Sequence, residues 1–99
     1  MDLITLDFET FYDKDFSLSK LTTEEYIRDP RFQIIGVGVK VNDSETEWAS
    51  GTHEEIAGFL SDPFFDWASS MVLAHNTLFD GAILSWLFNI KPKVWADTL

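Results

Sequence analysis

Two acidic residues near the start of the chain have the spacing of metal ligands. Asp7 and Glu9 come at the end of an apolar stretch that alternates like a β-strand. Because residues i and i+2 of a strand project on the same face, the two carboxylates converge. Adjacent carboxylates repel each other unless a cation lies between them, and Mg²⁺ and Mn²⁺ prefer oxygen ligands. The alternative is a strand that emerges into solvent and carries two surface acids.

A second pair of polar residues, Asn76 and Asp80, is spaced four positions apart at the start of an expected helix. Asn76 suits the N-cap position, and residues i and i+4 are neighbours on one helix face. Asp80 lies in the first turn, where the helix dipole favours negative charge. Capping and dipole stabilisation alone explain both residues, so this segment by itself is a weak indication of a metal site.

The elements that must position these residues follow from hydrophobic periodicity and helix caps. Strands are predicted over residues 3–9, 32–41, 45–49, 71–75 and 94–96, with a hairpin turn at Asn42 and Asp43. Capping boxes predict helices after Thr22 and Thr52, and a third helix runs from Asn76 to about residue 88. The fold class is therefore α/β. A mixed sheet begins with a three-stranded antiparallel meander and continues as α-β-α-β in a single domain over residues 1–99.

The composition narrows the class of protein. Apolar residues make up 45% of the 99 positions and aromatic residues 15%, which excludes a low-complexity disordered chain. There is no cysteine, which excludes disulfides and thiolate metal sites. Residues 1–3 are followed by no basic region or long apolar stretch, so neither a signal peptide nor a membrane span is predicted.

The net charge is unusual for a protein that binds nucleic acid. Seven Lys and Arg residues against 17 Asp and Glu residues give −10, whereas a phosphate-binding surface is normally basic. A chain with this charge can bind nucleic acid only if divalent cations neutralise part of the acidity and missing sequence or a partner domain supplies basic surface. The alternative is that the chain binds no nucleic acid or mimics it.

Taken together, the two acidic segments resemble motifs of the DEDD superfamily of 3′→5′ exonucleases. The likeness is strongest to the proofreading domains of family A (polymerase I-like) DNA polymerases of phages and bacteria. The first family motif, Asp-x-Glu closing an apolar strand, is matched by Leu6–Thr10, and the second, Asn-x-x-x-Asp with an aromatic before the Asp, by His75–Asp80. Residues 95–99 look like the Asp-Thr segment that follows the second motif, and residues 11–15, 26–32 and 35–39 also look like this group.

The resemblance implies a ribonuclease H-like fold and phosphodiester hydrolysis with two Mg²⁺ or Mn²⁺ ions. In such a site Asp7 contacts both ions, Glu9 binds the ion that carries the attacking water, and Asp80 supports the second ion. Thr10 is implied to contact the terminal nucleotide through its backbone or hydroxyl, and Asn76 to help place the helix of the second motif or the terminal nucleotide. The implied partners are the 3′ end of single-stranded DNA and a downstream polymerase domain or another chain, in the cytoplasm of a bacterial or phage-infected cell.

The chain departs from the family pattern in one respect. The third motif of the family, which supplies a fourth carboxylate and a Tyr or His that orients the water, has no match here. Asp97 and His75 match other family segments and do not replace it. We therefore expect a partial domain that is inactive alone. Two other hypotheses stay open, namely a non-catalytic ribonuclease H-like binding module and an acidic DNA-mimic protein.

Overall fold

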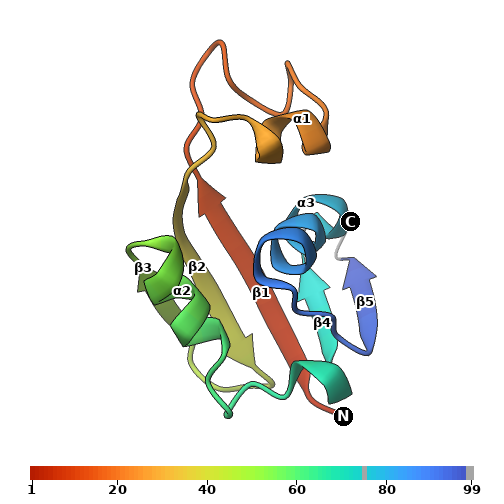
Figure 1. The fold of residues 1–99 in the computed structure, drawn as a ribbon. Coiled ribbons are helices and arrows are strands. Elements are labelled where there is room, and N and C mark those ends of the chain that lie inside the picture. The colour runs from red at the N-terminus through yellow and green to blue at the C-terminus, as the bar shows by residue number, and fades with distance from the viewer. Residues whose placement is uncertain (75, 98–99) are drawn as a thin grey trace.

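A computed structural model describes residues 1–74 and 76–97 of the chain. His75, the last residue of a predicted strand, lies outside the described residues. Five strands form one mixed sheet in the order β3-β2-β1-β4-β5 (Figure 1). These strands are β1 (Leu3–Thr10), β2 (Ile34–Val41), β3 (Glu47–Ser50), β4 (Met71–Ala74) and β5 (Val94–Asp97). The predicted α/β fold with a mixed sheet is confirmed, although β2 and β3 each begin two residues later than expected.

The pairing directions divide the sheet at β1. β1 and β2, and likewise β2 and β3, are antiparallel, which gives the predicted meander. β4 lies parallel to β1 on its other side, and β5 lies parallel to β4. β1 is thus the central strand, and its carboxyl end points the same way as those of β4 and β5 (Figure 1).

The helices begin where their caps predict. In α1 (Thr23–Arg28) and α2 (His53–Leu60) the predicted capping boxes are both formed, by Thr22 with Glu25 and by Thr52 with Glu55. Asn76 caps α3 (Thr77–Ala82), and its side chain accepts a hydrogen bond from the Phe79 N–H. A short 3₁₀ helix, η1 (Trp67–Ser69), was not predicted.

The helix after Asn76 differs from the prediction in its second half. From Ile83 to Leu87 it continues as a π-helix, η2, instead of an α-helix reaching residue 88. Ile83 and Leu84 are consecutive and fully buried, and Phe88 stacks on Phe8 with ring centroids 6.0 Å apart. The wider turn of the π-helix thus places two consecutive side chains, Ile83 and Leu84, in the core.

The core lies between the sheet and the helices. Figure 1 shows α2 and α3 over the same face of the sheet, with α1 beyond the carboxyl end of β1. The face of β1 that carries Ile4, Leu6 and Phe8 is buried against these helices. The opposite face carries Asp7 and Glu9, both exposed, as the alternation of a strand requires. None of the helices in the described ranges has the length and apolarity needed to cross a membrane.

Candidate functional site

The carboxyl end of β1 is bordered by α3 on the side where β4 stops. The pairing of β1 with β4 runs from Leu3 with Met71 to Leu6 with Ala74 and ends there. The next described residues of the chain, from Asn76, form the cap and first turn of α3. On the β4 side, the backbone of β1 after Leu6 therefore faces the first turn of α3, whereas β2 still pairs with β1 on the other side.

Asp80 closes this gap. Its Oδ1 accepts a hydrogen bond of 3.1 Å from the backbone N–H of Phe8, which stands between Asp7 and Glu9. Asp80 is 3% exposed, and it is the one buried charged group among the side chains whose burial the structure describes, which leave out Asp97. Burying a carboxylate is costly, so a fold that keeps one at this position points to a role beyond packing.

The electrostatic surroundings of Asp80 include both strand acids. Loss of hydration on burial raises the pKa of Asp80 from 3.8 to about 6, although backbone hydrogen bonds from Phe8 and Asn76 oppose this. The negative charges of Asp7 and Glu9 also raise this pKa. The charges of two strand acids thus reach an acid on a distant helix.

Asp7 and Glu9 interact directly with each other. The pKa of Glu9 is raised first by a side-chain hydrogen bond with Asp7, next by the charge of Asp7, and to a smaller extent by burial. Two ionised carboxylates this near each other repel unless a proton or a cation lies between them. The strand spacing thus does place both groups together on the exposed face.

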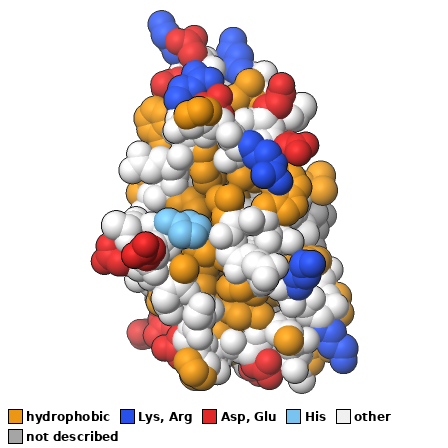
Figure 2. Space-filling model, viewed as in Figure 1, with side chains coloured by type: hydrophobic (Ala, Val, Ile, Leu, Met, Phe, Trp, Pro, Cys, Tyr) orange, Lys and Arg blue, Asp and Glu red, His pale blue; other side chains and the backbone are white. Residues whose placement is uncertain are grey.

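Among the side chains that the structure describes, none that is basic forms an ion pair with the acidic cluster of Asp7, Glu9 and Asp80. In residues 1–74 and 76–97 the ion pairs join Arg28 to Glu24 and Arg31 to Asp29. Lys and Arg residues do gather around α1 and the preceding loop, where Figure 2 shows them interspersed with acids. The cluster is therefore an uncompensated concentration of hard oxygen donors.

The donor chemistry of the acidic cluster fits a divalent cation, but its side chains do not form a ready coordination shell. Over the described ranges, no group of three His, Cys, Asp or Glu residues has the arrangement to hold one metal ion. One oxygen of Asp80 is engaged by the Phe8 N–H. A cation shared by the three acids would therefore require side-chain rotation, and Asp7 and Glu9 are exposed to solvent.

The two other predicted site residues, Thr10 and Asn76, flank the acidic cluster. The Thr10 hydroxyl lies 2.9 Å from the Tyr26 hydroxyl. Oδ1 of Asn76 accepts a 3.3 Å hydrogen bond from the Phe79 N–H as the helix cap. The structure thus gives each side chain a local bonding partner, while the predicted contact with a nucleotide stays a prediction.

A hollow of about 290 Å³ opens beside Glu9 and Thr10. Aromatic and apolar side chains line most of it, and the lining residues are Phe8, Glu9, Thr10, Tyr12, Ser17, Leu18, Tyr26 and Phe79. Tyr12 is 74% exposed and Leu18 41% exposed, so both present apolar surface to solvent next to an acid of the cluster.

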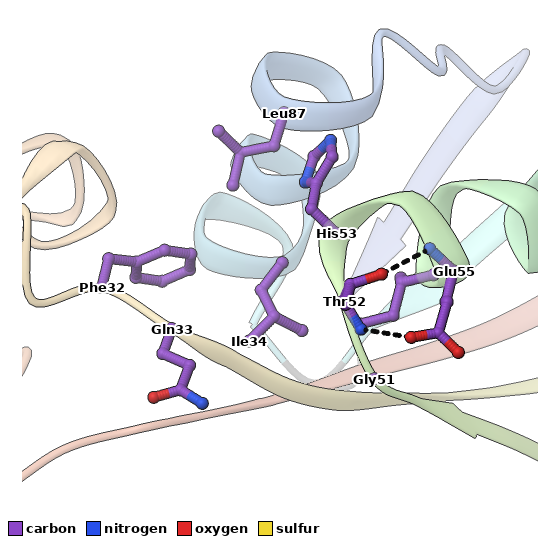
Figure 3. A pocket seen from close by; sticks show the side chains of 9 residues that line it. Phe32, Gln33, Ile34, Gly51, Thr52, His53, Glu55 and Leu87 are labelled. Carbon is purple, nitrogen blue, oxygen red and sulfur yellow. Dashed lines mark hydrogen bonds between the residues drawn. The ribbon is translucent and has the colours of Figure 1, made fainter.

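A larger hollow of about 520 Å³ lies between β2, the start of α2 and Leu87 (Figure 3). Its main polar groups are already occupied, because Thr52 and Glu55 bond each other in the capping box drawn there. His53 stacks on Phe88 with ring centroids 4.7 Å apart. No member of the acidic cluster lines this hollow, so its size does not make it the candidate site.

Sequence reasoning missed Tyr26. This residue is 2% exposed, and its hydroxyl bonds both the Thr10 side chain and the Phe11 carbonyl oxygen. It belongs to the segment 26–32 that looks like the exonuclease group, but the sequence pattern indicated no role for it in a site. Nothing in the local pattern connects it to a strand end 15 or more positions earlier.

The case for a function therefore rests on the geometry of the chain itself. Each of the two acidic segments is by itself a weak indication of a metal site. In the fold they lie together at the Phe8 N–H and carry three carboxyl groups. Comparisons with protein-family models, curated proteins and solved structures found no match to this chain.

Proposed function

We propose that the chain carries part of a two-metal 3′→5′ exonuclease site of the kind that proofreads DNA synthesis. The observation that carries the proposal is the meeting of Asp7, Glu9 and Asp80 without a basic partner in the described residues. The sheet order β3-β2-β1-β4-β5, with the acids at the end of the central strand, supports a ribonuclease H-like fold. Open α/β sheets bind ligands at this edge.

Each acid has a distinct role in the proposed site. Divalent ions bound there would activate a water molecule and stabilise the leaving 3′ oxygen. Asp7 is exposed and lies beside Glu9, so in the proposed site its carboxylate would be shared between the two ions. Asp80 is held by the Phe8 N–H and supplies a fixed oxygen from the helix side. Glu9 borders the hollow and faces the substrate.

The proposed substrate is the 3′ end of single-stranded DNA. The hollow next to Glu9 offers the rings of Tyr12 and Phe79 and the side chain of Leu18, which suit the terminal nucleoside. Thr10, at the rim, offers its backbone and hydroxyl. The net charge of −10 opposes DNA binding by this chain alone, so a polymerase domain or another chain is the proposed source of basic surface.

Metal titration tests the proposal. The purified 99-residue chain should bind Mn²⁺, measured by the loss of the free-ion electron paramagnetic resonance signal. Asp7→Ala should weaken this binding at least about tenfold, because it removes the ligand shared by both positions. The matched control is Asp43→Ala, which removes the same charge from an exposed turn.

The same titration separates the alternatives. A non-catalytic binding module with this fold should bind Mn²⁺ no better than Asp7→Ala does. We also expect the chain alone to leave single-stranded DNA intact in Mn²⁺, because no described residue supplies the water-orienting Tyr or His of the family's third motif. Equal Mn²⁺ affinity in the wild type, Asp7→Ala and Asp43→Ala would refute the nuclease proposal.

A further inference from the structure

The hydroxyl of Tyr26 connects α1 to the last residues of β1. It donates a hydrogen bond to the Phe11 carbonyl oxygen. It also lies 2.9 Å from the Thr10 hydroxyl. Because a phenol has one proton and Tyr26 gives it to Phe11, the Thr10 hydroxyl is the donor in the second bond. The buried Tyr26 hydroxyl therefore donates to Phe11 and accepts from Thr10, the two residues that follow Glu9.

The ring of Tyr26 contacts the other segment that carries an acid. Its centroid lies 5.9 Å from that of Phe79, the residue before Asp80. It also stacks on Phe16 at 4.5 Å and meets Phe32 edge-on at 5.5 Å. Tyr26 is thus held in place from three sides and touches both acid-bearing segments, the end of β1 through its oxygen and α3 through its ring.

The end of β1 needs such support because its strand pairing is irregular there. The register of β1 with β2 shifts between Glu9 and Thr10. On the other side, pairing with β4 has already stopped at Leu6. Pairing with β2 resumes at Thr10, and the Phe11 N–H bonds the Gln33 carbonyl oxygen. The end of β1 is joined to the helices by two contacts that bracket Glu9, one from Asp80 to the Phe8 N–H and one from Tyr26 to Thr10 and Phe11.

We propose that the Tyr26 hydroxyl is a positioning group for the acidic cluster. It fixes the end of β1 against α1 and α3, and so holds the backbone that carries Glu9 beside the helix that carries Asp80. Tyr26 acts through Thr10 and Phe11 and does not touch the cation. This inference rests on the proposed nuclease site and adds to it a residue outside the two acidic motifs.

The test removes the hydroxyl and keeps the ring. Tyr26→Phe in the 99-residue chain should weaken Mn²⁺ binding about tenfold, the effect typical of removing a group that orients a metal ligand. Ser44→Ala is the control, because it also removes one hydroxyl but from an exposed turn outside the acidic cluster and its hollow. Thr10→Val should reproduce the loss, and Tyr26→Phe with Thr10→Val should lose little more than either alone.

A second measurement requires no metal. The Phe8 amide, bonded to Asp80, should exchange its hydrogen faster in Tyr26→Phe than in the wild type, relative to amides at the centre of β2. A lower urea midpoint with unchanged Mn²⁺ affinity and unchanged Phe8 exchange would show a merely structural role and overturn the inference.

The two proposals fail in different ways. If the wild type binds no Mn²⁺, the nuclease site is refuted. Phe8 exchange then decides the positioning role by itself, since faster exchange in Tyr26→Phe supports it and unchanged exchange overturns it. If the wild type binds Mn²⁺ and Asp7→Ala does not, but Tyr26→Phe binds like the wild type, only the Tyr26 inference is lost.

Discussion

Asp80 on α3 accepts a hydrogen bond from the backbone N–H of Phe8 on β1, although 72 positions separate the two residues. The N–H belongs to the residue between Asp7 and Glu9, so this bond fixes the helix acid against the strand acids. A backbone donor is a neutral partner. It stabilises the Asp80 carboxylate without cancelling the negative charge of the cluster.

The first prediction concerns the pH dependence of stability. The pKa of Asp80 is raised from 3.8 to about 6, so the folded chain binds this proton more tightly than the unfolded chain does. The resulting stability is fully present below pH 3.8 and is lost as the pH rises through about 6. The loss is at most about 3 kcal/mol. Asp80→Asn should abolish this dependence and be the more stable protein at pH 7, as measured by urea unfolding between pH 3.5 and 7.5.

Asp43→Asn provides the control for that prediction, because it removes one charge from an exposed turn and should keep the wild-type dependence. Asp80→Asn should also bind Mn²⁺ more weakly, so that stability is gained and the proposed function lost. An Asp80→Asn protein with the same pH profile as the wild type would show that Asp80 does not carry the raised pKa.

The second prediction concerns the face of the sheet that carries Asp7 and Glu9. Gly36 lies opposite Glu9 on β2, and a Cβ there would meet the Trp48 ring and approach the Ala49 carbonyl oxygen to 2.8 Å. The carbonyl belongs to the backbone of the neighbouring strand and cannot move away freely. Gly36→Ala should therefore lower the free energy of unfolding by about 1–3 kcal/mol.

Gly58→Ala is the matched substitution for that experiment. Gly58 lies inside α2, and a Cβ added there would meet nothing within 4 Å outside its own stretch of helix. Alanine therefore adds helix propensity at no steric cost and should raise the free energy of unfolding by about 0.5–1 kcal/mol. Urea unfolding of both variants gives the two opposite signs, and a Gly36→Ala protein as stable as the wild type would show that β3 can shift.

The elements of this fold were largely predictable because their signals are local. Thr22 with Glu25 and Thr52 with Glu55 are capping boxes readable three residues apart, and both are formed. The alternation in β1 also placed Asp7 and Glu9 correctly on one exposed face. Such features depend on residues only a few positions apart, so they can be read from the sequence without knowledge of tertiary contacts.

The contacts that join distant segments were not predictable from those signals. The bond from Phe8 to Asp80 and the bonds from Tyr26 to Thr10 and Phe11 depend on which segments the fold brings together. The meeting of Asp80 with the strand acids was expected from the resemblance to exonucleases, and local spacing alone did not require it. The π-helix after Ala82, with Ile83 and Leu84 both buried, likewise had no signal in the local sequence pattern.

The last prediction concerns the effect of one substitution, Asp7→Asn, on the pKa values of Glu9 and Asp80. Asp7 raises the pKa of Glu9, chiefly through their side-chain hydrogen bond, and its charge also raises the pKa of Asp80. Asp7→Asn removes the charge and keeps the size of the side chain. The pKa of Glu9 should therefore fall toward 4.5, and that of Asp80 should fall below about 6.

Side-chain carboxyl ¹³C shifts followed from pH 3 to 8 measure both values in one titration. Glu54→Gln is the control, because Glu54 lies in the first turn of α2 and is no cause of either raised pKa. A fall at Glu9 alone would show that Asp7 and Asp80 are too far apart to share a cation. A fall at both residues would establish in solution that the strand acids and the helix acid form one electrostatic unit, as the proposed two-metal site requires.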